Sequence, residues 1–265
     1  MDSPKIVTLT SDFGLKDPYV AEMKGVVLSV CPTAIIVDIT HEVEKFNIRE
    51  GAFVLASTAP YFPKGTVHIA VVDPTVGTGR RPIIVETEDS FFVGPDNGVL
   101  MLTAEAQHIK QMRHVESRRF MRPHVSNTFH GRDVFAPVAG HLLNGVSLEE
   151  FGPQITEVVK PKFVQITRSE ESVSGEVLHV DDFGNIITNI PAKVALAFTL
   201  DAVMVEMAAQ KPFHMKMARA YADVKHNEPV ALVGSHSYLE IAVNQGNAAA
   251  KFSVKAGDAV FLSKP

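Results

Sequence analysis

Two polar clusters interrupt apolar stretches of this sequence, and together their side chains could activate a water molecule. The first cluster, Val71–Arg81, contains the carboxylate of Asp73 and the guanidinium of Arg80. The second cluster, Thr128–Asp133, adds the imidazole of His130. Each lies where an apolar segment begins or ends, the usual place for a site on a rigid scaffold. An acid, a fixed cation and an imidazole can orient and deprotonate water, so we interpret the chain as an enzyme.

A third cluster, Thr10–Gly14 followed by Asp17, comes at the end of an apolar, strand-like run. The carboxylate of Asp12 could accept hydrogen bonds from two vicinal ribose hydroxyls, and that of Asp17 could attract an ammonium or sulfonium group. The structural alternative is a turn followed by a helix cap, because Asp17-Pro18 precedes a helical pattern. No Gly-x-Gly-x-x-Gly follows this strand, so the dinucleotide-binding fingerprint is absent.

Structural alternatives also exist for the first two clusters. Asp73 and Arg80 could pair merely to brace a turn, although the glycines between them could instead expose N–H groups to an anion. The Lys-Ser/Thr of a phosphate-binding P-loop is missing. His130 could cap the following helix or act as a base or donor. Arg132-Asp133 is more typical of a brace than of a reacting pair.

Competing kinds of site have little support in the residue spacing. No His-x-x-x-His, His-Glu-x-x-His or cysteine-rich pattern occurs, and His124 and His130 fit one helical face poorly, so we expect no metal site. No Gly-x-Ser-x-Gly elbow supports serine catalysis. Cys31 is the only cysteine, and we expect a small core residue.

Composition narrows the class of protein. The 265 residues carry a net charge of -5, with a pI near 6.1, which argues against a nucleic-acid-binding surface. We interpret the short basic run Arg113–Arg122 as a solvated loop. No apolar run reaches the ~18 residues of a membrane span, and the N-terminal residues lack a signal-peptide pattern. We therefore expect a cytoplasmic protein with no nucleic-acid or membrane partner.

The first part of the chain alternates strand and helix patterns, which favours a three-layer α/β domain with a mostly parallel sheet. Expected strands are Ile6–Thr10, a buried strand at Ala34–Asp38, Val67–Val72, Ile83–Glu86 and Ser90–Val93, and expected helices are Tyr19–Val30, Ile48–Ala59 and Val134–Leu143.

The pattern changes at Phe151-Gly152-Pro153 and Lys160-Pro161-Lys162, so we expect domains at 1–160 and 161–265. Short strands at close spacing favour a smaller C-terminal β-barrel. They are Val173–Val180, Ile186–Ile190, Val203–Met207, Pro229–Val233, Tyr238–Val243 and Ala259–Leu262, with a brief helix at Ala192–Phe198. The polar loop Asp181–Asn185 reads as a β-turn and Asn247–Ala249 as a helix start, although Phe183 could also stack on a base.

The chain resembles, over nearly its whole length, the S-adenosyl-L-methionine hydroxide adenosyltransferases, relatives of the fluorinase and chlorinase that attack the same substrate. The matching segments are Thr10–Gly14, Val72–Pro74, Gly77–Arg81, Gly94–Gly98, Thr128–Asp133, Asp182–Asn185 and Asn244–Ala249. The resemblance implies an N-terminal α/β domain, a C-terminal β-barrel and a homotrimer. Active sites in that family lie between the N-terminal domain of one subunit and the C-terminal domain of its neighbour.

The resemblance also implies the reaction, which is displacement by water or hydroxide at the ribose 5′ carbon of S-adenosyl-L-methionine. The products are adenosine and L-methionine, and no metal or cofactor takes part. The family's catalytic residues fall on Asp73, Arg80 and His130. Its ribose-binding position falls on Asp12, and its methionine-binding positions fall on Asp17 and Ser235. On the adenine side the matching residues are Phe183, Asn185 and Ala248. Further substrate-binding positions fall on Phe46, Thr128, Phe129 and Asn247.

The halogenases of this group carry Tyr where this chain has Asp73 and His130. A carboxylate beside a halide would repel it, so Asp73 favours water as the nucleophile over chloride. Thr75 departs from the Gly common in relatives, and His236 replaces a fluorinase Arg, which leaves contacts to the methionine carboxylate open. The alternatives are a nucleoside- or S-adenosylmethionine-binding protein with vestigial activity, or halide-dependent adenosyl transfer.

Overall fold

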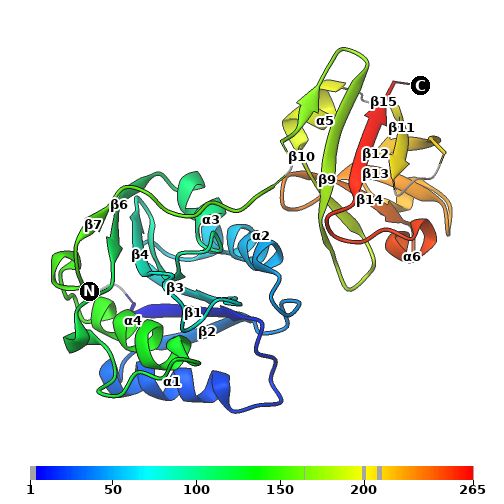
Figure 1. The fold of residues 1–265 in the computed structure, drawn as a ribbon. Helices are drawn as coiled ribbons and strands as arrows, with labels where there is room; N and C mark the ends of the chain where they lie inside the picture. Colours follow the sequence, from blue (N-terminus) through cyan, green and yellow to red (C-terminus); the bar gives the residue numbers. More distant parts are fainter. Residues whose placement is uncertain (1–3, 164, 199–200, 208–210, 265) are drawn as a thin grey trace. The chain divides into compact units, whose positions relative to one another are not determined.

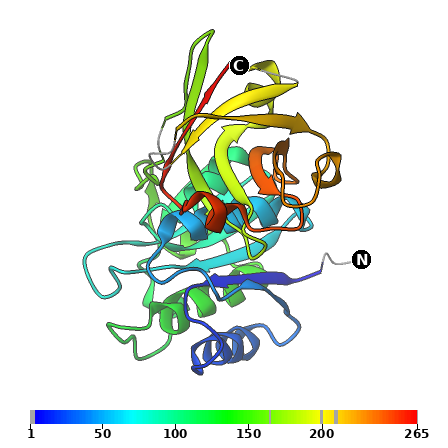
Figure 2. The same ribbon diagram turned by 90° about the vertical axis from the view of Figure 1, so that its right-hand side faces the viewer.

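The computed structural model describes residues 4–163, 165–198, 201–207 and 211–264 (Figure 1). The chain forms two compact units, Met1–Lys162 and Phe163–Pro265. Each unit has its own sheet and its own apolar core, and Figure 2 shows the same elements from the side.

The first unit is built on a seven-stranded sheet with the strand order β2-β1-β3-β5-β4-β6-β7. The strands are β1 (Ile6–Ser11), β2 (Ile35–Thr40), β3 (Thr66–Val71), β4 (Pro82–Thr87), β5 (Ser90–Pro95), β6 (Ile109–His114) and β7 (Gln154–Ile155). The helices are α1 (Tyr19–Val30), α2 (Ile48–Thr58), α3 (Met101–Ala106) and α4 (Ala136–Leu143). Pairing is parallel across β2, β1, β3 and β5, and antiparallel from β5 through β4 and β6 to β7.

Helices cover both faces of this sheet, which confirms the three-layer α/β fold. On one face α1 and α4 pack on Leu9 and Ile69, and on the other α2 and α3 pack on Ala70 and Phe92 (Figure 1). All six residues of β3 are buried because neighbouring strands and both helical layers surround it. Near-continuous apolar strands are the sequence signature of such a two-sided burial.

One strand differs from expectation. Ala34–Asp38 was expected to be buried, but β2 lies at the edge of the sheet and Ile35 is 52% exposed. An apolar run looks the same in sequence whether one or two neighbours pair with it. Strand order is set by the whole sheet, so the expectation of a buried strand was wrong.

The basic run Arg113–Arg122 is only partly the solvated loop that we expected. Arg113 belongs to β6, and Val115 and Phe120 are buried. The ring of Phe120 packs against that of Phe151 with centroids 4.6 Å apart. The apolar residues within the run anchor it, while the guanidinium of Arg119 lies at the surface and pairs with Glu150.

The second unit confirms the β-barrel. Seven strands form a closed ring, β10-β14-β13-β12-β11-β15-β9, because β9 also pairs with β10, and β8 adds to β9. The strands are β8 (Thr167–Arg168), β9 (Ser172–Val180), β10 (Ile186–Pro191), β11 (Ala202–Met207), β12 (Phe213–Ala218), β13 (Pro229–Val233), β14 (Tyr238–Val243) and β15 (Ala259–Ser263), with helices α5 (Ala192–Phe198) and α6 (Ala248–Phe252). Closure leaves few strand edges unpaired, and the inward side chains form the core.

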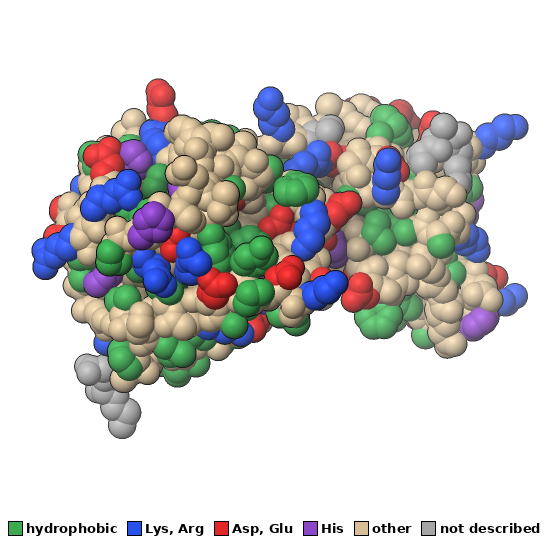
Figure 3. All heavy atoms as spheres, turned by 60° about the horizontal axis from the view of Figure 1, so that its bottom comes forward, with side chains coloured by type: hydrophobic (Ala, Val, Ile, Leu, Met, Phe, Trp, Pro, Cys, Tyr) green, Lys and Arg blue, Asp and Glu red, His purple; other side chains and the backbone are tan. Residues whose placement is uncertain are grey.

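Acidic and basic side chains lie interspersed on the face drawn in Figure 3. None of the described helices has the length and apolar character that crossing a bilayer requires.

Candidate active site

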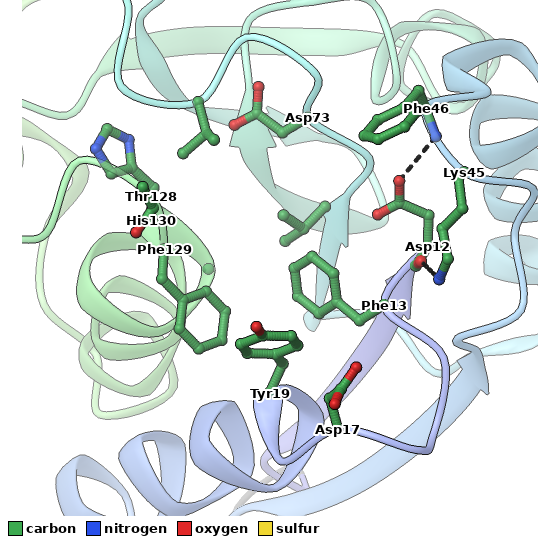
Figure 4. A pocket seen from close by; sticks show the side chains of 13 residues that line it. Asp12, Phe13, Asp17, Tyr19, Lys45, Phe46, Asp73, Thr128, Phe129 and His130 are labelled. Atoms are coloured by element: carbon green, nitrogen blue, oxygen red, sulfur yellow. Dashed lines mark hydrogen bonds between the residues drawn. The ribbon is translucent and has the colours of Figure 1, made fainter.

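The carboxyl ends of β1, β2 and β3 open into a cavity of about 330 Å³ (Figure 4). Ligands of open α/β sheets usually bind at this edge. The lining residues are Asp12, Phe13, Asp17, Tyr19, Lys45, Phe46, Val71, Asp73, Val76, Thr128, Phe129, His130 and Gly131. The cavity therefore gathers every site residue predicted for the first domain except Arg80, which contacts two of its lining residues, Asp73 and His130.

Asp73, Arg80 and His130 form one hydrogen-bonded unit at this cavity. Nη2 of Arg80 donates to Oδ2 of Asp73 and also contacts Nδ1 of His130 at 2.9 Å. The side chains of Arg80 and Asp73 are only 7% and 4% exposed. Water therefore screens this ion pair little. The three side chains are in contact although up to 57 positions separate them in the sequence.

Local packing fixes the position of Asp73 after β3. The side-chain amide of Asn97 donates to the carbonyl of Val72 at 2.8 Å, and the hydroxyl of Thr75 donates to Oδ1 of Asp73 at 3.3 Å. Gly77 has a φ of +78°, and a Cβ there would overlap the carbonyl oxygen of Asn127. Only glycine lets this turn approach the segment that carries His130 so closely.

The bond from Arg80 fixes the tautomer of His130. A guanidinium can only donate hydrogen bonds, so Nδ1 of His130 must accept, and the neutral ring carries its proton on Nε2. Burial lowers the pKa of His130 below its ordinary value, and the positive charge of Arg80 lowers it further. His130 is therefore a neutral donor through Nε2–H near neutral pH.

In the part of the chain that is described, Asp73 is the acid that pairs with the guanidinium of Arg80. Its carbon lies 5.3 Å from the ring centroid of Phe135, a cation–π distance. Its Nε and Nη1 are buried, and neither has a hydrogen-bond partner among the residues that the structure describes. Asp73 thus provides the counter-charge for Arg80.

Asp12 lies at the opposite end of the cavity, after β1. Its Oδ2 accepts a hydrogen bond from the amide of Phe46 at 2.9 Å, and the ammonium of Lys45 bonds its carbonyl oxygen (Figure 4). Phe46 has a φ of +66°, an unusual value for a bulky residue. Phe46 is 68% exposed and lines the cavity. The second carboxylate oxygen of Asp12 can accept from a ligand hydroxyl.

A Ser-His-Asp chain that the sequence did not predict lies beside Asp12. Nδ1 of His41 lies 2.7 Å from the hydroxyl of Ser11, and Nε2 of His41 lies 3.1 Å from Oδ1 of Asp38. Ser11 is buried, does not line the cavity, and also accepts from the amide of Phe13 at 3.3 Å. Without access to a ligand it cannot act as a nucleophile, so this chain braces the ends of β1 and β2.

The segment that carries Thr128, Phe129 and His130 is braced by Arg132 and Asp133, as the sequence suggested. Arg132 donates to the buried carboxylate of Asp133 at 2.8 Å and to Glu22 of α1 at 2.7 Å. Asp133 in turn accepts from the amide of Ser126 at 2.9 Å. His130 makes no side-chain cap for the π-helical turn that follows, Gly131–Phe135, so the capping alternative was wrong.

Six lining residues were not predicted as site residues from the sequence: Phe13, Tyr19, Lys45, Val71, Val76 and Gly131. Phe13 and Tyr19 lie on either side of Asp17 in the sequence, and aromatic residues next to a strand-end acid were a usable signal. Asp17 itself is exposed and faces the cavity, whereas the N-cap position of α1 is Pro18, without a side-chain cap. The helix-cap alternative for Asp17 was therefore wrong.

Of the five site residues predicted for the second unit, two line the same cavity. Phe183 and Asn185 line a cavity of about 610 Å³ with Asp181 and Tyr221. Asp181 accepts from the amide and side-chain nitrogens of Asn185 at 2.8 and 2.9 Å, which orients the Asn185 side chain. Its turn closes through a bond from the Gly184 amide to the Asp181 carbonyl.

Three other predicted residues lie outside that cavity. Asn247 caps α6 by accepting from the amide of Ala250 at 2.6 Å, as expected of a helix start. Ala248 is fully buried in the barrel core, and Ser235 is exposed on the turn before β14. Ligand contacts of these three residues stay predictions.

The sequence matches two domains of one family. Residues 7–152 match the SAM hydroxide adenosyltransferase N-terminal domain, and residues 175–261 match the C-terminal domain. The chain belongs to the SAM hydroxide adenosyltransferase family. The cavity at β1, β2 and β3 lies wholly within the first matched domain.

Proteins similar to this chain match it over almost its full length. A Methanocaldococcus jannaschii protein named (R)-S-adenosyl-L-methionine hydrolase is 38% identical and covers 94% of this chain and 92% of its own. A Thermus thermophilus protein of the same name is 37% identical and covers 97% of this chain and 98% of its own. A fluorinase of Actinopolyspora mzabensis is 28% identical and covers 99% of this chain and 98% of its own.

Solved structures agree with this assignment. An uncharacterized conserved protein from Thermotoga maritima has a TM-score of 0.93 at 42% identity, covering 98% of this chain and all of its own. A conserved hypothetical protein from Thermus thermophilus has a TM-score of 0.78 at 34% identity, covering 97% and 99%. The fold that these structures share with this chain therefore extends through both units.

Proposed function

We propose that this protein hydrolyses S-adenosyl-L-methionine to adenosine and L-methionine by attack of water at the ribose 5′ carbon. The observation that carries the proposal is the Asp73–Arg80–His130 unit at the wall of a cavity that also contains Asp12. Relatives at 37–38% identity over nearly the whole chain bear the name of this hydrolase, with the (R) configuration at sulfur.

In the proposed reaction, the water oxygen forms a bond to C5′ while the C5′–S bond breaks. The electron pair of that bond stays on sulfur, which becomes the neutral thioether of methionine, and the water loses one proton. A sulfonium leaves readily, so it needs no general acid, metal or cofactor. Holding water in line with the breaking bond supplies up to ~7–11 kcal/mol of the barrier reduction in favourable cases.

The tautomer of His130 divides the roles among the three residues. Because Nδ1 is occupied by Arg80, Nε2–H of His130 donates to the attacking water and orients it. The carboxylate of Asp73 accepts the proton that the water loses, and Arg80 holds both groups in place. A carboxylate is a weak base, but a carbon with so good a leaving group requires little deprotonation before attack.

The charge of Asp73 favours water over a halide. This carboxylate is buried, so its field at the nucleophile position is weakly screened, and an anion a few ångströms away would be repelled. Water is neutral and gains a proton acceptor from the same group. The lower identity to fluorinases, 28% against 38% for the hydrolase of Methanocaldococcus jannaschii, is consistent with this choice.

We further propose that the protein is a homotrimer in which the second unit of a neighbouring subunit provides the adenine contacts, with Phe183 and Asn185 foremost. The resemblance to the family supports this arrangement. Ribose contacts then come from Asp12, and methionine contacts from Asp17. A cytoplasmic location stays a prediction.

The test is incubation of the purified protein with each sulfur epimer of S-adenosyl-L-methionine in ¹⁸O-water, with and without a chelator. We expect adenosine labelled at its 5′ oxygen, at equal rates with and without the chelator, and at least about a hundredfold less labelled product from the Asp73→Asn variant. Retained nucleoside without turnover would replace the proposal with a binding function. Formation of 5′-chloroadenosine in chloride would replace water as the nucleophile.

A further inference from the structure

Three aromatic rings that the catalytic proposal does not use form one wall of the first cavity. The ring centroids of Phe13, Tyr19 and Phe129 are mutually 5.2 to 5.9 Å apart, and every pair meets edge to face. All three rings line the cavity, and Tyr19 is 44% exposed. Figure 4 shows them together on the side of the cavity away from Asp73.

The position of this wall matters because an in-line displacement has a fixed geometry. If water is held at Asp73 and His130, the departing sulfur must lie on the far side of C5′. That direction leads across the cavity toward the three rings. We propose that Phe13 and Tyr19 recognise the positively charged sulfonium of the substrate, an inference that rests on the proposed function.

The chemistry of the wall fits a soft cation. The faces of aromatic rings carry negative potential and attract cations such as quaternary ammonium groups, and a sulfonium with its methyl group has similar charge and shape. The ring of Phe129 already holds a cation, because the guanidinium carbon of Arg132 lies 5.1 Å from its centroid. This contact leaves Phe13 and Tyr19 as the rings that we assign to the ligand. The carboxylate of Asp17, which also lines the cavity, suits the methionine ammonium.

The sign of the effect on turnover follows from the charge balance. The sulfonium loses its positive charge as the C5′–S bond breaks, so a cation–π contact is strongest with the bound substrate and fades toward the transition state. An interaction of this kind lowers KM without raising kcat. It also weakens on formation of the neutral thioether, which favours release of methionine. Recognition by rings thus selects the cation and does not retain the product.

The test compares binding of S-adenosyl-L-methionine with binding of the neutral thioether S-adenosylhomocysteine, which lacks the charge. Dissociation constants for Phe13→Leu and Tyr19→Leu are measured by calorimetry in the Asp73→Asn background, where we expect turnover to be at least about a hundredfold slower. We expect the preference for the cation to fall roughly two- to thirtyfold in each variant. Tyr19→Phe keeps the ring and should keep the preference, and Tyr61→Leu, at a 76% exposed residue outside the cavity, is the matched control.

Equal losses for both ligands, or no loss, would overturn the inference and leave the hydrolase proposal intact. Absence of adenosine from the wild-type protein would instead overturn the hydrolase proposal. In the active background we expect Tyr19→Leu to raise KM while kcat stays constant or rises, and a fall in kcat alone would also contradict the inference. Thermal melting shows whether half-buried Phe13 tolerates the change, and exposed Tyr19 provides the test if it does not.

Discussion

A single nitrogen of Arg80 joins Asp73 to His130. Nη2 donates to the Asp73 carboxylate and, at 2.9 Å, to Nδ1 of His130. A guanidinium NH₂ group has two hydrogens, so both are used and the three side chains are locked together. The consequence is that His130 presents a donor and Asp73 an acceptor to the cavity, a division of roles with measurable results.

Asp73→Asn removes the proton acceptor but keeps an oxygen for Arg80. We expect adenosine formation to fall at least about a hundredfold, while the dissociation constant of the substrate changes little. Because Arg80 then has no counter-charge in a buried site, we also expect a loss of roughly 3 kcal/mol in the free energy of unfolding. Single-turnover kinetics and denaturant unfolding measure the two effects. Asp89→Asn, which breaks the surface pair with Lys64, is the control and should change neither much. Undiminished activity in Asp73→Asn would refute the role of this residue.

His130 should control the acid limb of the pH–rate profile. Burial and then the charge of Arg80 lower the pKa of this imidazole, so it remains neutral until the pH falls below the ordinary value of about 6.5. We expect kcat/KM to be constant through pH 6.5 and to decline only below it. His130→Ala should lose most turnover yet still bind substrate. A decline that begins above pH 6.5 as the pH falls would contradict the lowered pKa of His130.

His68 should make the stability of the protein depend on pH. This residue is buried in β3, its Nδ1 lies 2.7 Å from the hydroxyl of Thr8, and burial lowers its pKa from 6.5 to about 4. Between those values the unfolded chain binds a proton that the folded chain does not. Stability is therefore complete above pH 6.5 and is lost as the pH falls toward 4, by roughly 3 kcal/mol.

Urea unfolding at pH 7 and pH 4.5 measures this loss. His68→Asn keeps a polar atom near the Nδ1 position and should flatten the dependence, whatever its effect on stability at pH 7. His108→Asn alters an exposed histidine and should leave the dependence as in the wild type. Equal slopes in His68→Asn and the wild type would assign the acid sensitivity to other groups.

The proposed trimer predicts complementation between two inactive variants. Asp73→Asn damages the first unit, and Asn185→Ala damages the proposed adenine contact of the second. If each site uses units from two subunits, randomly mixed equimolar trimers contain intact sites at about one quarter of positions. We expect co-expressed or co-refolded mixtures to recover about that share of wild-type activity. Activity no higher than that of the separate variants would show that subunits do not share sites.

The sequence predicted those features that depend on neighbours along the chain. The apolar spacing of Val20, Met23, Val26, Val27 and Val30 placed a helix at Tyr19–Val30. The helix α1 has these bounds, with the first four side chains buried and Val30 half-buried. Alternating strands and helices gave the α/β layers of the first unit, and close-spaced short strands gave the barrel of the second. Local spacing succeeds here because side-chain periodicity reports directly which face of an element is buried.

The same local signal missed the short polar elements. Strand β6 carries Lys110, Gln111 and Arg113 among its apolar residues, so its pattern resembles a loop. It forms because β4 and β7 pair with it on either side. The edge position of β2 was missed for the complementary reason, since strand order is a property of the sheet.

At the active site, the amino-acid sequence specifies the available chemical groups: the acid, cation and imidazole of Asp73, Arg80 and His130, and the carboxylates of Asp12 and Asp17. How these groups are used depends on contacts that form on folding. The tautomer of His130 depends on a bond to a residue 50 positions away, and the aromatic wall depends on Phe129 meeting Phe13 and Tyr19 from a distant segment. Hydrogen-bond direction and ring contact are set by distances in space, which residue spacing along a chain does not contain.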